Sequence, residues 1–151
     1  MTFKKAVEST PDVKDAWNPG LQALRASDRR RLLPTAPRDL TGSVDLDTTL
    51  RNAHPNAARW DYAIGYRLNS REMIYWVEVH PATDGEISVV LNKFAWLTTW
   101  LSANAKQLNR FSREFVWISS SRASFTPLAP QAKRLASSGI RHVGRRFRMG
   151  D

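Results

Sequence analysis

Three apolar segments between residues 60 and 94 contain ionisable side chains, and this pattern restricts the fold more than any other feature of the chain. The segments are 60–64, 75–81 and 89–94, and the four ionisable residues in them are Asp61, Glu78, His80 and Lys93. An unpaired carboxylate or ammonium in a protein interior costs several kcal/mol or shifts its pKa. The fold must therefore pair these groups with one another or place them around a ligand.

The length of 151 residues fits one domain with a substantial core. We expect a helical N-terminal segment over residues 1–34 and an α/β core over residues 43–149. The chain has no cysteine, which excludes disulfides, thiolate zinc sites and cysteine nucleophiles. No stretch resembles a signal peptide or approaches the ~20 apolar residues that span a bilayer. We therefore expect a cytoplasmic protein that does not enter membranes.

The spacing of apolar and turn-forming residues predicts the order of the elements. In the first third, Thr10-Pro11-Asp12 marks one helix start, and Asn18-Pro19-Gly20 begins a second helical segment that Pro34 ends. Strands are predicted over 43–50, 60–68, 73–80, 114–119 and 140–149, and helices over 86–105 and 127–138. This order predicts an α/β (α+β) fold with a central mixed sheet flanked by helices.

The connection between the second and third strands decides where Asp61 lies relative to Glu78. A two-residue loop at Asn69-Ser70 places Asp61 opposite Glu78 in a β-hairpin. A loop at Ser70-Arg71 places Asp61 opposite His80 instead. Because residues two apart share a face of a strand, both loops bring the three polar groups together. A three-residue loop would put Asp61 on the opposite face.

Lys93 falls within the apolar face of the predicted helix, between the positions of Leu97 and Trp100. A lysine there needs an anionic neighbour, or it extends along its apolar stem to the sheet edge. Two carboxylates on adjacent strands are hard oxygen ligands that suit Mg²⁺ or Mn²⁺ together with a substrate phosphate. Lys93 would then stabilise developing negative charge.

Two further sets of residues leave alternatives open at this site. His80 could act as a base or a ligand because its pKa is near neutral, but a histidine on a strand more often only forms a hydrogen bond. Asp45 and Asp47 share a face of the first predicted strand and compete with Asp61 for the ligand role. The alternative is that both are surface acids beside a loop.

An aspartate on one strand and Glu-x-Lys on the next, within an α-β-β-β-α-β order, form the pattern of the PD-(D/E)xK nuclease superfamily, and residues 43–149 resemble it. Asp61 matches the family aspartate, Glu78 the glutamate and Val79 the position whose carbonyl binds metal. His80 stands where the family lysine is expected, and Trp60 replaces the proline. Members can move that lysine onto the following helix, where Lys93 lies. The resemblance implies a restriction-endonuclease-like fold and a Mg²⁺ or Mn²⁺ cofactor.

The C-terminal third carries most of the net charge of +9. From residue 106 to 151 there are ten Lys and Arg against two acidic residues, which is a local charge of +8. Such a surface favours a polyanionic partner such as DNA or RNA, and the alternative is a solubilising surface. The expected phosphate-binding residues are Arg141, Arg145, Arg146 and Arg148.

These observations support three hypotheses about function. The first is a metal-dependent nuclease-like domain that acts on nucleic-acid phosphodiesters through Asp61, Glu78 and Lys93, with His80 in an auxiliary role. The second is a non-catalytic module of the same fold that binds nucleic acid or protein, because His80 replaces the lysine. In the third, Lys93 pairs with Glu78 only to complete a core.

Overall fold

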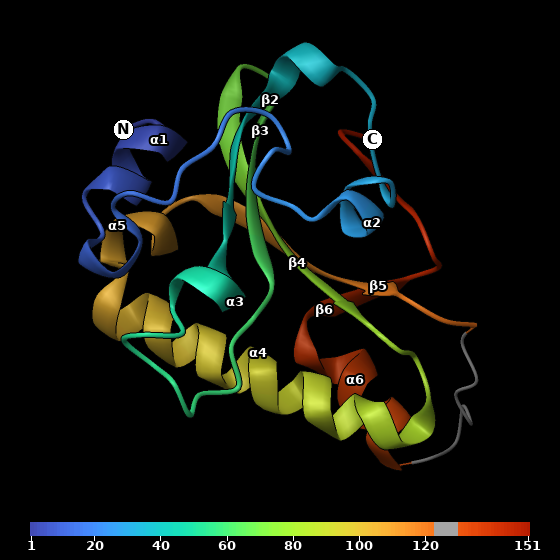
Figure 1. Ribbon diagram of the computed structural model, residues 1–151. Coiled ribbons are helices and arrows are strands. Elements are labelled where there is room, and N and C mark those ends of the chain that lie inside the picture. The colour runs from blue at the N-terminus through green and yellow to red at the C-terminus, as the bar shows by residue number, and fades with distance from the viewer. Residues whose placement is uncertain (123–129) are drawn as a thin grey trace.

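The computed structural model describes residues 1–122 and 130–151, and its centre is a five-stranded mixed sheet (Figure 1). The strand order is β2-β3-β4-β5-β6, with β2, β3 and β4 antiparallel and with β5 and β6 parallel to β4. The strands of this sheet are β2 (Leu40–Asp45), β3 (Tyr62–Leu68), β4 (Arg71–His80), β5 (Ser112–Ser119) and β6 (Ile140–Val143). The prediction of a central mixed sheet flanked by helices is confirmed.

The β3–β4 hairpin has the first of the predicted loops. Leu68 pairs with Arg71, and the two loop residues Asn69 and Ser70 have φ angles of 51° and 66°. Two successive positive φ angles are the mark of a type I′ turn, whose twist matches that of the flanking strands. The register runs to Tyr62 opposite Val77, so the next residue, Asp61, comes level with Glu78.

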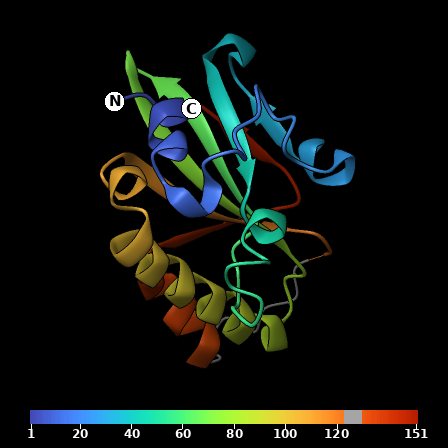
Figure 2. The same cartoon turned by 60° about the vertical axis from the view of Figure 1, so that its left-hand side comes forward.

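Helices cover one face of the sheet, and Figure 2 shows them as a layer beside it. These are α1 (Phe3–Glu8), α4 (Asp84–Asn104), α5 (Lys106–Asn109) and α6 (Pro130–Ser138). The core beneath them takes in all six tryptophans, four of them fully buried and two packed at its edge. Burial of such large rings contributes strongly to stability, and it makes these tryptophans core residues. Residues 127–129 of the predicted last helix lie outside the described part of the chain.

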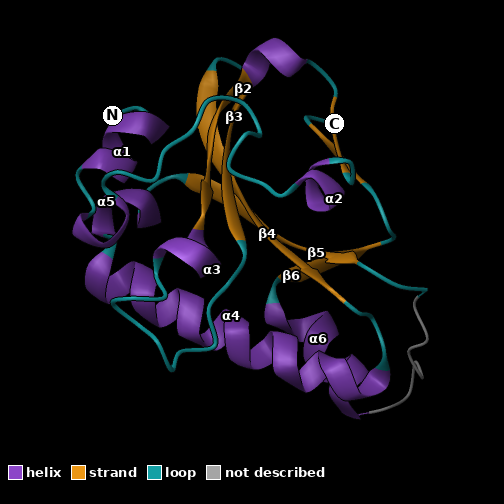
Figure 3. Ribbon diagram, in the orientation of Figure 1, coloured by secondary structure: helices purple, strands orange, loops and turns teal. Residues whose placement is uncertain are grey.

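The opposite face is covered by the segment 21–34 and by the C-terminal strand. Figure 3 shows the short helix of this segment and the C-terminus across the sheet from the long helix α4. This segment contains α2 (Ala26–Arg29) and β1 (Leu32–Pro34), and β1 pairs in parallel with β7 (Phe147–Met149) in a separate two-stranded sheet. The prediction of one long helix before Pro34 is therefore wrong. The predicted terminal strand is also divided, because β6 ends at Val143 and β7 crosses to the other layer.

Two other predicted elements differ from the structure. The predicted first strand ends at Asp45, whose carboxylate accepts a hydrogen bond from the Thr48 amide and starts α3 (Leu46–Thr49). Asp45 and Asp47 therefore do not share a strand face. The helix start expected at Thr10 is only a 3₁₀ turn, η1 (Pro11–Val13), and a second such turn, η2 (Pro37–Asp39), precedes β2. Among the described residues, no helix combines the length and apolarity needed to cross a bilayer.

Candidate functional site

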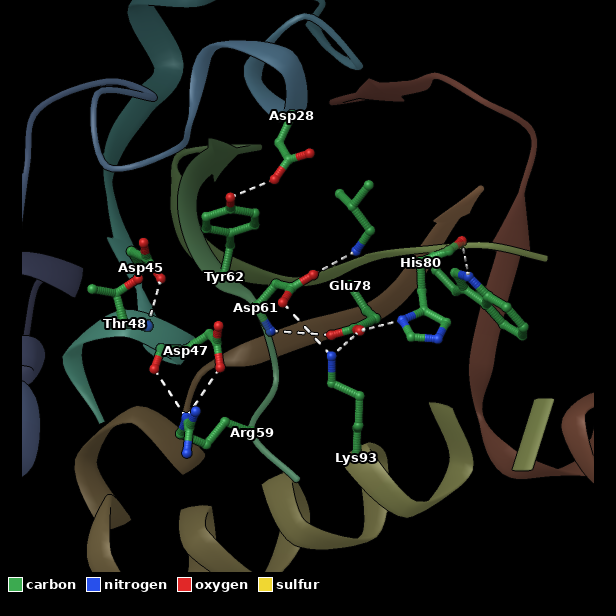
Figure 4. Close-up of polar contacts among 12 residues, drawn as sticks. Asp28, Asp45, Asp47, Thr48, Arg59, Asp61, Tyr62, Glu78, His80 and Lys93 are labelled. Carbon is green, nitrogen blue, oxygen red and sulfur yellow. Dashed lines mark hydrogen bonds and ion pairs between the residues drawn. The ribbon is translucent and has the colours of Figure 1, made fainter. Parts of the chain in front are cut away.

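A cavity of about 270 Å³ lies at the end of the sheet where β3 begins and β4 ends, between the α2 region and α4. Asp61, Val79, His80 and Lys93 line it. The rest of the wall consists of three further aspartates from the α2 and α3 regions together with Arg25, Tyr62 and Ser120. Figure 4 shows the side chains of Asp61, Glu78 and Lys93 pointing toward one another, from the residue before β3, from β4 and from α4. The structure thus brings together the four residues that the sequence places in the candidate site.

Asp61 and Glu78 are tied to each other through the backbone. The Asp61 amide donates to Glu78 Oε1 at 3.1 Å, and the Val79 amide donates to Asp61 Oδ2 at 2.9 Å. Since β3 has not yet begun at Asp61, its carboxylate provides the acceptor for the Val79 amide of β4. The side chain of Glu78 is fully buried. Two carboxylates are thus held side by side at the end of the hairpin.

Lys93 lies in the third turn of α4, and its side chain reaches these two carboxylates. Its ammonium contacts Glu78 Oε2 and lies 3.7 Å from Asp61 Oδ1. Only 16% of the side chain is exposed, so Lys93 does not extend to solvent at the sheet edge. The apolar residues on both sides of Lys93 position α4 against the sheet, and that packing delivers the ammonium to the carboxylates.

Burial shapes the protonation of the site. Burial raises the pKa of Asp61 from 3.8 to about 7, and the negative charge of Glu78 adds to that rise while Lys93 opposes it. For Lys93, burial by itself lowers the pKa, but the attraction of Glu78 and Asp61 outweighs it and the net shift is upward. The two carboxylates therefore keep Lys93 protonated, while one of them, Asp61, resists ionisation.

His80 bridges the site to the start of α4. Its Nε2 lies 2.6 Å from Glu86 Oε2, and its Nδ1 lies 3.5 Å from Glu78 Oε2. The hydrogen bond to Glu78 raises the pKa of His80, burial lowers it, and Glu86 raises it again, so that the net shift is upward. His80 thus lies between two carboxylates, one on its own strand and one in the first turn of α4.

The acidic wall includes residues that the sequence pattern does not connect with the hairpin. Asp28 of α2 lines the cavity and accepts a hydrogen bond from the Tyr62 hydroxyl at 2.5 Å. Asp45 and Asp47 also line it, but Asp47 is paired with Arg59 at 3.0 Å. Asp28 is about 30 residues from β3 in the chain, and only the packing of α2 over the second face brings it here.

Three or more acidic or histidine side chains do not converge into a complete metal cage anywhere in residues 1–122 or 130–151. A divalent ion held by Asp61 and Glu78 would therefore need other oxygens. Val79 offers one, since its amide and carbonyl point to the same strand edge, toward the cavity that it lines. Mg²⁺ commonly keeps several waters and takes only one or two carboxylates, so a full cage is not a requirement.

The four arginines expected to contact nucleic acid fall into two groups. Arg141 on β6 lies 3.7 Å from Glu114, and Arg148 on β7 lies 3.7 Å from Asp151. Arg145 and Arg146, between these strands, line a second cavity together with residues near α2. Comparison of the chain with the sequences that define protein families, with curated proteins and with solved structures finds no match.

Proposed function

We propose that this protein is a divalent-metal-dependent nuclease, or a degenerate descendant of one, whose site is built on Asp61, Glu78 and Lys93. The observation that carries the proposal is the convergence of two carboxylates and one ammonium on a concave site at the end of a hairpin. A core of this size satisfies its charges more simply with one acid and one base. A second buried carboxylate, whose pKa is raised to about 7, favours a cationic ligand.

The residues present fit Mg²⁺ or Mn²⁺. Both side chains offer hard carboxylate oxygens, and the first coordination sphere can be filled by the Val79 carbonyl, by water and by a phosphate oxygen. A bound dication would also attract both carboxylates and so offset the repulsion between Glu78 and Asp61. When bound, the metal would polarise a phosphoryl oxygen and lower the pKa of a coordinated water.

The topology supports assignment to the PD-(D/E)xK nucleases as a proposal. In chain order, α1, β2, β3, β4, α4 and β5 follow the α-β-β-β-α-β order of that superfamily, with the short elements α2, β1, α3 and α5 inserted between them. Asp61 and Glu78 occupy the two acidic motif positions, and His80 stands at the lysine position. The lysine function would then fall to Lys93, because its ammonium reaches the same two carboxylates from α4.

The chain's own residues have separable tasks in this scheme. The Lys93 ammonium would stabilise negative charge that develops on the phosphoryl oxygens, a task that needs a fixed cation in a poorly hydrated site. Glu78 would hold that ammonium in place. His80, which contacts both Glu78 and Glu86, would orient the Glu78 carboxylate and hold a proton next to the site.

A second candidate function is a non-catalytic nucleic-acid-binding or protein-binding module on the same fold. One observation favours it: the Lys93 ammonium already contacts Glu78 and lies near Asp61, where a metal ion would bind. In that case Lys93 completes the charge balance, and His80 at the lysine position marks the loss of catalysis.

The test compares wild type, Glu78→Gln and a control, Glu114→Gln, which removes an exposed carboxylate from the neighbouring strand β5. Thermal unfolding is measured with EDTA, Mg²⁺ or Mn²⁺, and cleavage of plasmid and oligonucleotide substrates is followed in parallel. Because an ion that binds only the native state raises stability, Mn²⁺ should raise the Tm of wild type and of Glu114→Gln but not of Glu78→Gln.

Cleavage should follow the same order among the three proteins. A metal response without cleavage would assign the second candidate function. An equal response of all three proteins to Mn²⁺ would place the ion elsewhere and refute the proposed site.

A further inference from the structure

A second cavity, of about 460 Å³, lies between α2 and the connection from β6 to β7. Its lining residues are Ser27, Arg30, Arg31, Arg145 and Arg146, so that it contains four guanidinium groups and no carboxylate. Over the residues that the structure describes, none of these four arginines has a carboxylate within 4.0 Å. We call this the basic cavity, and the cavity around Asp61 the acidic cavity.

The small β1–β7 sheet assembles the basic cavity. Leu32 pairs with Phe147, and the Phe147 amide donates to the Arg31 carbonyl at 2.8 Å. The Arg31 guanidinium in turn donates to the carbonyls of Arg145 and Ser119, each at 3.2 Å. These contacts fix the β6–β7 connection against α2, so residues more than 110 positions apart meet at one site.

The arginines of the cavity divide into one structural residue and three that face solvent. Arg31 is committed to backbone carbonyls. Its neighbour Arg29 does not line the cavity, because it turns away to donate to the Leu24 carbonyl at 2.9 Å. Arg30, Arg145 and Arg146 are exposed. Their forked donors match the geometry of phosphate oxygens.

Like charges gathered without acids repel one another, and a bound anion relieves that repulsion. The exposed arginines Arg141 and Arg148 each lie beside a carboxylate, so this arrangement is not general on the surface of the C-terminal region. A concave site with several guanidinium groups and one serine hydroxyl suits a phosphate group.

The two cavities share a wall. Arg25 and Asp28 line the acidic cavity, whereas Ser27, Arg30 and Arg31 line the basic one. Asp28 and Arg31 are in direct contact, because the Arg31 amide donates to the Asp28 carbonyl at 3.0 Å. Ser120, which lines the acidic cavity, has its carbonyl 3.5 Å from the Arg31 guanidinium. One nucleic-acid strand that passes over α2 would therefore reach both cavities.

We propose that the basic cavity binds a phosphate of the nucleic-acid strand, close to the phosphodiester that enters the acidic cavity. The inference rests on the proposed function, because it takes a nucleic acid as the ligand. The phosphate is either an internal phosphodiester or the terminal phosphate of a strand end, and both present the same oxygens to the arginines.

The test uses the full chain and a double variant, Arg30→Gln with Arg146→Gln, because over residues 1–122 and 130–151 neither guanidinium donates to the backbone of a neighbour as that of Arg31 does. The control is Arg38→Gln with Arg71→Gln, which removes the same charge at exposed positions near the other end of the β3–β4 hairpin. Binding of short oligonucleotides with a 5′-phosphate or a 5′-hydroxyl is measured by fluorescence anisotropy in EDTA at several salt concentrations.

We expect the Arg30/Arg146 variant to bind about tenfold more weakly than wild type, as for the loss of charge-assisted hydrogen bonds. Its salt slope should fall by roughly 0.7 per lost contact with a single strand. The affinity and the salt slope of the Arg38/Arg71 control should change far less. A loss confined to 5′-phosphorylated oligonucleotides would identify a terminal phosphate, and an equal loss for both would identify an internal one.

Equal effects of the two double variants would overturn the proposal, as would the absence of wild-type binding at low salt. Because this experiment is done in EDTA, its result is independent of catalysis. If wild type shows neither a Mn²⁺ response nor cleavage, but the Arg30/Arg146 variant still binds oligonucleotides more weakly than wild type, the nuclease proposal is refuted and the phosphate site is retained.

Discussion

The acidic and basic cavities lie on the two sides of α2, and they hold their charges by opposite physical means. In the acidic cavity, Glu78 is fully buried and Lys93 is only 16% exposed, and opposite charges meet at contact distance. In the basic cavity, Arg30, Arg145 and Arg146 are exposed, and each ionisable residue that lines the cavity is an arginine. Removal of one charge from the first cavity leaves a buried partner uncompensated, whereas removal from the second relieves repulsion.

The difference separates folding from binding. Buried charges that are satisfied only by one another are coupled to the stability of the whole domain. Exposed arginines without partners contribute little to folding and keep their donors available for a ligand. Mutations in the acidic cavity should therefore change mainly the free energy of unfolding. Mutations in the basic cavity should change mainly the binding of nucleic acid.

The largest effect is expected for Lys93→Met, which keeps the apolar stem and removes the ammonium. It leaves the buried Glu78 carboxylate without its cation, so the free energy of unfolding at pH 8 should fall by about 3–5 kcal/mol. Chemical denaturation in EDTA measures this loss. Mn²⁺ should then stabilise the variant more than it stabilises wild type, because the ammonium no longer repels the ion.

The control for this prediction is Lys133→Met on the exposed side of α6, which should change stability by less than about 0.5 kcal/mol. A Lys93→Met protein as stable as wild type would show that the ammonium does not balance the carboxylates. In that case the acidic cavity would behave like the basic one, and the comparison between them would fail.

The next effect is the pH dependence of stability that Asp61 imposes. In the folded protein Asp61 keeps its proton up to about pH 7, whereas in the unfolded chain it loses it near pH 3.8. The folded state thus holds the extra proton in this window, so stability should fall as pH rises from about 4 to 7, by up to about 1.4 kcal/mol per pH unit. Above pH 7 this contribution is constant.

The Asp61→Asn variant should lack this decrease in stability between about pH 4 and 7, because the amide is neutral throughout that range. His80 acts in the same direction, since its raised pKa makes stability decline with rising pH above about 6.5. A His80→Gln protein measured in parallel separates the two contributions. Identical pH profiles of Asp61→Asn and wild type would show that Asp61 does not titrate as its burial requires.

The meeting of Asp61, Glu78 and Lys93 could be predicted from the sequence because its determinants are local. Both two-residue loops that the sequence allows bring Asp61 to the face of Glu78, and the structure has the one at Asn69-Ser70, which sets the register of the hairpin. Lys93 follows from the period of one helix whose apolar face is read directly from the chain. Each step uses fewer than 20 neighbouring residues and one strong geometric rule.

The basic cavity and the second face could not be predicted in the same way. Nothing between residues 21 and 34 indicates that the segment packs on the sheet as a short helix and a strand, because its pairing partner is β7, at the other end of the chain. The same long-range pairing breaks the predicted terminal strand at Val143. Asp28 enters the acidic cavity only as a consequence of that packing.

Ser70→Gly tests the turn on which the acidic cavity depends. Ser70 has a φ of 66°, a conformation that costs a residue with a Cβ atom more than it costs glycine. The replacement should raise the free energy of unfolding by roughly 0.5–1 kcal/mol without altering the Mn²⁺ response. A matched control, Ser137→Gly in the exposed part of α6, should lower it by about 0.5 kcal/mol because glycine is a poor helix former. Destabilisation by Ser70→Gly would indicate a different turn and a different register.

The smallest effect on stability is expected for the Arg30→Gln and Arg146→Gln pair. Since neither guanidinium has a carboxylate partner among the described residues, their removal should change the free energy of unfolding by less than about 0.5 kcal/mol, and in the stabilising direction at low salt. Added salt screens the repulsion between exposed charges, so the gain should disappear near 1 M salt, where the Debye length is about 3 Å. Thermal unfolding at low and high salt measures both values. A loss of several kcal/mol would mean that these arginines support the fold as Lys93 does, and the basic cavity would then be a structural element and not a binding site.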